Sequence, residues 1–204
     1  EQNRFTFLFE HPEDLAARHD ILKASPEEQA AFFIRSHAYR VNFVDCNPNA
    51  LIQSQNQHDF LLNYYIGNDE SKWASGVRSY KTVKYQELYD GVDLVAVVDG
   101  GNLKYDFMVS PGSSTNQIKL NFEGLDQMSI DSEGNLVLGT SVGEMKELSP
   151  FAYQMINGSL VPVKCNYVLE GSEVHFEFPE GFNEDIALVI DPVVIASTLS
   201  GTPG

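Results

Sequence analysis

Residues 79–112, SYKTVKYQELYDGVDLVAVVDGGNLKYDFMVSPG, decide the fold of this chain. Apolar and polar residues alternate along the stretch, and the alternation breaks at Asp-Gly and Pro-Gly pairs. A period of two is typical of strands that bury one face. Glycine in such pairs accepts the positive φ that tight hairpin turns require. The stretch therefore predicts antiparallel strands joined by hairpins.

The same pattern continues toward the C-terminus. Short alternating runs are separated by Glu123-Gly124, Glu133-Gly134-Asn135, Asn157-Gly158 and Glu170-Gly171. Regularly spaced strands with such turns predict an all-β fold, either an antiparallel sandwich or an open barrel of hairpins. Strands do not alternate with helical patterns, which disfavours a doubly wound α/β sheet.

The first sixty residues mix two periods. Residues 4–10, RFTFLFE, alternate and predict a strand. The period then changes, and Ser25-Pro26-Glu27-Glu28 has the residues of a helix start, with a serine cap, proline at the first helical position and a glutamate that completes a capping box. We predict a short helical insertion at about residues 11–36, packed on the domain's own sheet. Residues 61–67 predict a further strand, and residues 73–78 a connection.

Length and composition favour one domain. The 204 residues are 43% apolar, which suffices for a real core. We expect a single β-rich domain over residues 1–196 and a linker over 197–204, toward a repeat region further along. The polar start without methionine leads us to expect a piece of a longer precursor. Cys46 and Cys165 fit either one disulfide or two buried thiols.

The charge excludes some partners. The formal net charge of −16 repels phosphate backbones and anionic lipid surfaces, so we expect neither nucleic-acid binding nor membrane insertion. No apolar run approaches the roughly 20 residues that span a bilayer. Such a charge is otherwise an ordinary cause of solubility.

Three patterns raise catalytic or metal chemistry. Gly139–Gly143 match G-x-S-x-G around Ser141, but a nucleophile elbow needs a strand-to-helix turn and the surroundings predict a hairpin. His175, the one histidine after Ser141, lies in an apparent strand. The many carboxylates mostly occupy turns, where solvated Asp and Glu are ordinary. The loops at 68–70 and 131–135 are rich in oxygen ligands for calcium but lack the EF-hand order.

Three aromatic residues are candidates for a binding surface. Tyr64, Tyr65 and Trp73 flank a Gly-Asn-Asp loop and could form a platform on which sugars stack. The alternative is that they are cross-strand or core partners, as aromatic residues in strands usually are.

Several blocks resemble one family in the same order. They are NYYIGNDESKW (63–73), VKYQELYDGVDLV (83–95), NLKYDFMVSPG (102–112), IKLNFEG (118–124), SIDSEGNLVLGTSVGEMKELSPFAYQ (129–154), NGSLVPVKCNYVL (157–169), LVIDP (188–192) and VVIASTLSG (193–201). Together they are similar to the N-terminal domain found ahead of seven-bladed β-propeller (SBBP) repeats. The likeness covers about residues 60–200.

The resemblance implies a large secreted or surface-attached bacterial protein, in which this domain precedes a propeller or repeat array. We therefore expect a non-catalytic structural or interaction module, with adhesion as one such role, and no catalytic, metal or cofactor site. Its partners would be the downstream repeats of its own polypeptide or other surface components. A carbohydrate-binding module that uses Tyr64, Tyr65 and Trp73 is the alternative, and a hydrolase is a third hypothesis.

Overall fold

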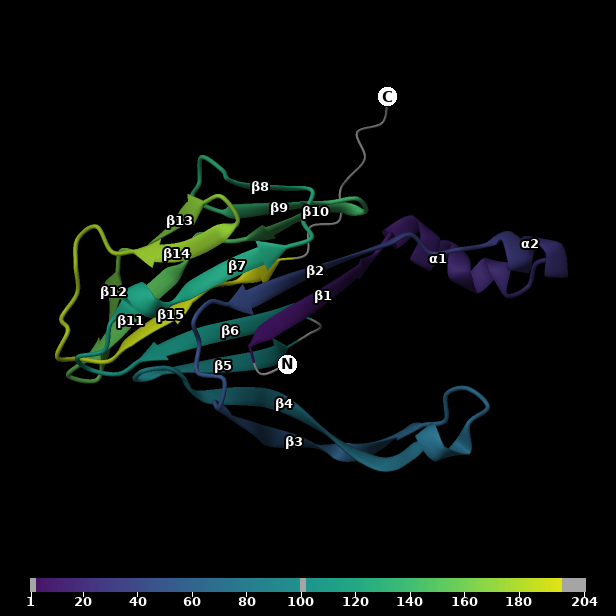
Figure 1. Ribbon diagram of the computed structural model, residues 1–204, viewed down its shortest axis with the longest axis horizontal. Coiled ribbons are helices and arrows are strands. Elements are labelled where there is room, and N and C mark those ends of the chain that lie inside the picture. The colour runs from purple at the N-terminus through teal and green to yellow at the C-terminus, as the bar shows by residue number, and fades with distance from the viewer. Residues whose placement is uncertain (1–2, 100–101, 196–204) are drawn as a thin grey trace.

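The computed structural model describes residues 3–99 and 102–195 of the chain. It confirms the all-β prediction, with antiparallel strands throughout and two short α-helices near the N-terminus (Figure 1). The predicted linker at 197–204 lies outside the described residues. No helix in the described ranges is long and apolar enough to cross a bilayer.

The strands form three sheets (Figure 1). The five-stranded sheet runs β1 (Arg4–Glu10), β2 (Ser36–Phe43), β7 (Lys119–Glu123), β14 (Glu173–Glu177), β13 (Asn166–Glu170). The seven-stranded sheet runs β12 (Ser159–Val163), β11 (Phe151–Ile156), β15 (Leu188–Asp191), β6 (Asn102–Val109), β5 (Val92–Asp99), β4 (Ala74–Tyr89), β3 (Leu51–Tyr64). The four-stranded sheet runs β16 (Val194–Ile195), β10 (Gly143–Glu147), β9 (Leu136–Thr140), β8 (Gln127–Ile130).

The core lies between the five-stranded and seven-stranded sheets. Alternate residues of β2 and β6 face it, among them Tyr39, Val41, Tyr105 and Phe107, all buried. Rings from opposite sheets meet there, as the Phe107–Phe176 pair does with centroids 5.8 Å apart in an edge-to-face arrangement. The body of the chain is therefore a sandwich held by the inward halves of its alternating strands.

The helical insertion is present but does not pack as predicted. Helices α1 (Pro12–Ile21) and α2 (Pro26–Ala31) lie between β1 and β2. The capping box at Ser25 is confirmed: its Oγ accepts the Glu28 N–H at 3.3 Å, and Glu28 Oε2 accepts the Ser25 N–H at 2.9 Å. Neither helix buries a residue, so the expected packing on the sheet is wrong. Figure 1 shows both helices beyond the end of the β1–β2 hairpin.

The predicted strand at 61–67 is the distal part of a far longer hairpin. β3 has 14 residues and β4 has 16, and the two pair antiparallel from Leu51–Gln86 to Tyr64–Ala74. Residues 74–78, predicted as a connection, therefore belong to a strand. The short 3₁₀ turn η1 (Glu70–Lys72) lies in the loop that joins them.

The remaining predictions concern cysteines and turns. Cys46 is half-buried, Cys165 is buried, and both are free thiols. The apolar run at 160–169 is divided between β12 and β13. β11 and β12 are joined by a tight turn at Asn157 and Gly158, both with positive φ, as the Asn-Gly pair predicts.

Candidate functional site

The most exposed apolar surface lies on the free half of the β3–β4 hairpin, which we call the β-arm (residues 56–81). β5 pairs with β4 only from Thr82 to Tyr89, so beyond Thr82 the two strands pair with each other alone. Figure 1 shows the ribbon leaving the sandwich and ending in solvent. A two-stranded ribbon with no third layer buries little on either face.

The tip of the β-arm is held by its own hydrogen bonds. Trp73 Nε1 donates to the Gly67 carbonyl at 3.1 Å. The carboxylate of Asp69 accepts the Ser71 backbone N–H at 3.1 Å and the Ser71 hydroxyl at 2.6 Å. These hydrogen bonds lower the pKa of Asp69. The tip is therefore an ordered turn with defined side-chain positions.

The structure brings the three predicted aromatic residues to this tip. Tyr64 is 44% exposed, Tyr65 61% and Trp73 39%, so none of them is a core residue. Tyr65 and Trp73 are in contact, with ring centroids 5.5 Å apart and planes at 77°. Further exposed apolar side chains of the β-arm are Phe60, Leu61, Ile66 and Tyr80. Exposed apolar side chains gathered on one element make it a candidate interaction surface.

The β-arm also differs from the body in charge. Residues 56–81 contain three acidic residues and three basic ones, so their formal charges cancel, whereas the whole chain carries −16. The element that carries these exposed apolar side chains thus has no net formal charge, unlike the chain as a whole.

A second projection is the α-arm, residues 11–35. Its base is closed by Asp14 and Arg35: the guanidinium donates to both carboxylate oxygens at 2.8 Å, and the Arg35 N–H adds a bond of 3.0 Å. The Arg35 hydrogen bonds hold the pKa of Asp14 well below its usual range. Leu22 and Phe33 are largely exposed. In Figure 1 both arms leave the sandwich toward the same side.

Ser141 has a histidine neighbour that the sequence did not reveal. Ser141 lies in the two-residue turn of the β9–β10 hairpin, so the strand-to-helix elbow is absent and the hairpin prediction is confirmed. His37, from β2, places Nδ1 2.9 Å from Ser141 Oγ and accepts the Ser141 N–H at 3.1 Å. His37 Nε2 lies 2.5 Å from the Gly124 carbonyl oxygen, to which it donates. The contact links the turn to the five-stranded sheet.

One pair of acidic groups was also hidden from sequence reasoning. Asp106 and Asp191 lie on neighbouring strands of the seven-stranded sheet, where burial, then the charge of Asp191, raises the pKa of Asp106 to about 6.

The oxygen-rich loop at residues 131–135 is held by contacts within the chain. Asp131 Oδ1 accepts the N–H groups of Glu133 and Asn135, and its Oδ2 accepts a hydrogen bond from Lys146 Nζ at 3.0 Å. Both carboxylate oxygens of Asp131, which the sequence offers as calcium ligands, thus already accept hydrogen bonds from the chain itself. Over the described ranges no group of three or more His, Cys, Asp or Glu residues is placed to hold a metal ion.

One carboxyl group lies in the hydrophobic core. Glu147 is 1% exposed, and its Oε2 accepts hydrogen bonds from the Tyr105 hydroxyl at 2.9 Å and the Tyr167 hydroxyl at 3.4 Å. Within the described residues Oε1 has no hydrogen-bond partner. Burial raises the pKa of Glu147 to about 7, against the tyrosine bonds that lower it. The carboxyl group is inaccessible to solvent, so it belongs to the core of the sandwich and not to a surface site.

The geometry defines an all-β sandwich with two projecting arms. The chain belongs to a family described as a domain of unknown function (DUF7948), whose model matches residues 1–193. Neither a curated protein nor a solved structure matches the chain.

Proposed function

We propose that the chain is a non-catalytic structural or interaction module of a secreted or cell-surface bacterial protein, ahead of a propeller or repeat array. The observation that carries the proposal is the β-arm, an ordered ribbon whose aromatic tip stands clear of the sandwich. The acidic composition and the resemblance to SBBP-associated domains support the cellular setting.

Energetics favour a bound β-arm. An isolated two-stranded hairpin is at best marginally stable in water. Each large apolar side chain that moves from solvent into an interface contributes about 1.5–3 kcal/mol. Phe60, Leu61 and Ile66 are exposed enough to gain this burial. A partner that covers them would therefore stabilise the arm as well as bind it.

We assign the following repeats of the same polypeptide as the partner, with another surface component as the alternative outcome of the test. Covalent linkage makes contact with following repeats intramolecular, which raises the effective concentration of a weak apolar site. Because the formal charges of the β-arm cancel, the partner surface that contacts it need not carry a particular net charge.

A photo-crosslinking amino acid at Ile66, 75% exposed, tests the proposal in the full-length protein as its own cells make it. The same residue at Met155, an exposed apolar position of the sandwich, is the matched control. We expect crosslinks from position 66 to one segment of the following repeats, identified by mass spectrometry. Crosslinks at 66 that do not exceed those at 155 would reject the β-arm as the interaction surface. Crosslinks to a separate protein would replace the partner and keep the interaction role.

A carbohydrate-binding module is the second candidate, because Tyr64, Tyr65 and Trp73 are all exposed. The 77° angle between Tyr65 and Trp73 means that the two rings cannot both lie flat on one planar ligand. A screen of the purified chain against soluble and insoluble polysaccharides, with and without calcium, decides this point. Saturable binding that Tyr65→Ala weakens would favour the carbohydrate role, and absence of binding would leave the protein partner.

A further inference from the structure

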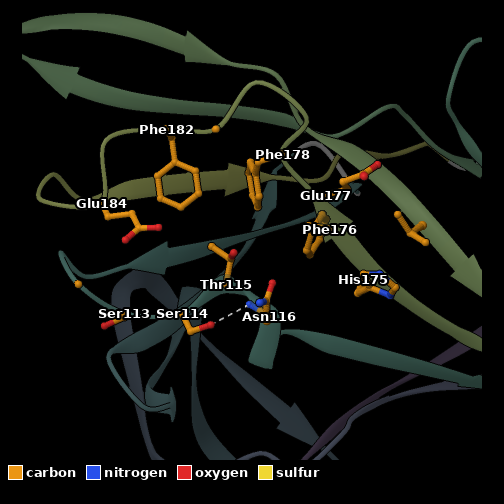
Figure 2. Close-up of a pocket in the computed structure, with 13 residues that line it drawn as sticks. Ser113, Ser114, Thr115, Asn116, His175, Phe176, Glu177, Phe178, Phe182 and Glu184 are labelled. Atoms are coloured by element: carbon orange, nitrogen blue, oxygen red, sulfur yellow. Dashed lines mark hydrogen bonds between the residues drawn. The ribbon is translucent and has the colours of Figure 1, made fainter.

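A groove of about 660 Å³ opens where the loop after β6 meets the loop after β14 (Figure 2). In Figure 1 this is the end of the sandwich opposite the two arms. The loops are fixed to each other, because the Gly112 N–H donates to the Glu184 carbonyl at 2.8 Å. The side chain of Gln117 also ties the first loop to the Asp90 carbonyl at 2.8 Å. The groove is therefore preformed by backbone contacts rather than assembled by a ligand.

Two carboxylates and one histidine ring are among the residues that line the groove. Glu177 and Glu184 line it and are exposed, and neither Lys nor Arg is among the lining residues. Across the described ranges neither of these carboxylates has a hydrogen-bond or ion-pair partner. Elsewhere the chain does pair its surface carboxylates with lysine, as in Lys119–Glu173 at 3.1 Å and Lys164–Glu180 at 3.3 Å. The groove thus keeps its two negative charges uncompensated.

Aromatic and hydroxyl groups complete the lining. Phe178 and Phe182 are half-buried and meet edge to face, with centroids 5.0 Å apart. Figure 2 shows Phe182 and Glu184 on one side of the groove, facing Thr115. A ring face attracts a cation, and the hydroxyl oxygens of Ser113 and Thr115 can accept hydrogen bonds from one. Carboxylate, ring and hydroxyl together supply what an ammonium or guanidinium group requires, and an anion would find no counter-charge.

We propose that this groove binds a cationic group carried on an apolar stem, such as the side chain of lysine or arginine in a peptide. The stem contacts Phe178 and Phe182, and the cation lies beside the Glu184 carboxylate, while Glu177, on the far side of Phe178 in Figure 2, adds to the negative field. The chain's net charge of −16 raises the local concentration of such ligands. The site is separate from the β-arm, so it stands or falls independently of the proposed function.

The test is an NMR titration of the whole chain with N-acetyl-lysine methylamide, followed through the backbone amides of Gly112, Asn116 and Gly181, which line the groove. N-acetyl-norleucine methylamide, which has the stem without the charge, is the matched probe. We expect saturable shifts at these amides with the lysine probe and none with norleucine. Equal shifts from both probes, or no shift from lysine, would overturn the proposal.

Substitutions separate the groove from the general acidic field. Glu184→Gln weakens binding of the lysine probe by about threefold, the scale of a partly screened ion pair, and Glu177→Gln, beyond Phe178, weakens it less. Glu170→Gln removes one charge from an exposed turn outside the groove and leaves binding unchanged. An equal loss in Glu170→Gln would show that the probe senses only the net charge. All three residues are exposed, so the variants keep the fold.

Discussion

The two halves of one hairpin contrast more sharply than any two separate elements. Near the sandwich, β4 contributes Tyr85 and Leu88 to the core, and β5 pairs along it. Beyond Thr82 the same strand carries Tyr80, and Trp73 directly precedes the strand; both side chains are exposed. Both halves carry large apolar side chains, and what differs is the sheet that faces them. Strand patterning thus specifies the ribbon, whereas the facing sheet decides whether its apolar side chains stabilise the fold or remain available for binding.

Truncating one large side chain in the sandwich and one in the β-arm gives the largest predicted difference. Phe107→Ala, in the fully buried core, lowers the free energy of unfolding by about 3–5 kcal/mol because it leaves a cavity. Phe60→Ala, on the exposed β-arm, changes it by less than about 0.5 kcal/mol. Urea unfolding followed by far-ultraviolet circular dichroism measures both. Similar losses in the two variants would mean that the β-arm is packed in solution.

The buried carboxyl makes the stability of the sandwich sensitive to pH between about 4.5 and 7. The folded-state pKa of Glu147 is raised to about 7 from its usual 4.5, so its contribution favours folding below pH 4.5 and is lost as the pH rises to 7. At 1.36 kcal/mol per pKa unit, the loss is about 3 kcal/mol. Relative to Glu147→Gln, the wild-type chain should therefore lose about this much stability between pH 4.5 and 7 in urea titrations.

The glutamine variant retains acceptors for the Tyr105 and Tyr167 hydroxyls but has no charge to bury. The difference between the two proteins at each pH isolates Glu147 from other titrating groups, including Asp106, whose pKa is also raised. Parallel pH profiles for the two proteins would contradict the prediction.

Two glycines with the same backbone conformation sharpen the comparison further. Gly91 (φ 65°) lies in the sandwich and Gly76 (φ 67°) in the β-arm. Alanine at either position incurs the left-handed strain of about 1–2 kcal/mol. At Gly91 the added Cβ would also overlap the Ser113 side chain, while at Gly76 it meets nothing within 4 Å. We expect Gly91→Ala to lower the midpoint temperature of thermal unfolding. We expect Gly76→Ala to leave that midpoint unchanged and only to accelerate amide hydrogen exchange within the β-arm. Equal midpoint shifts would contradict this.

The smallest effect concerns the α-arm. Ser25→Ala removes the cap that accepts the Glu28 N–H and costs the local helix about 1 kcal/mol. Because α2 buries no residue, global unfolding is unchanged and only the exchange of amides at 26–31 accelerates. Ser25→Thr, which keeps the capping oxygen, is the control. A lower global stability in Ser25→Ala would show that the arm packs on the sandwich.

Sequence reasoning recovered the features that depend on local chemistry. The strand at residues 4–10, the hairpin turn at Asn157-Gly158 and the capping box at Ser25 each follow from a few neighbouring residues. The exposure of Leu61 and Phe33 cannot be predicted in this way. An apolar residue in a strand or helix pattern looks the same in the sequence whether or not a sheet faces it. For this reason the helical insertion was expected on the sheet and is found beyond it.

The site features depend on longer range still. Tyr64, Tyr65 and Trp73 were recognised from the loop beside them, although nothing in the sequence places that loop at the end of a ribbon. His37 and Ser141 are separated by 104 residues and meet only through sheet topology. The burial of Glu147 could have been predicted from the sequence, because Glu147 lies two residues after Met145 in β10 and so on the same, buried face of the strand. A carboxylate at a core-facing position indicates a buried group when the alternation is followed strictly.

Trp73 is the one tryptophan in the chain, and it lies at the tip of the β-arm. Its emission therefore reports on a place far from the core, where it is tied to Gly67 and touches Tyr65. Fluorescence and circular dichroism should accordingly record different events in this protein: the first reads the arm and whatever covers it, the second the sandwich. The chain carries an intrinsic optical probe at the surface where we propose that its partner binds.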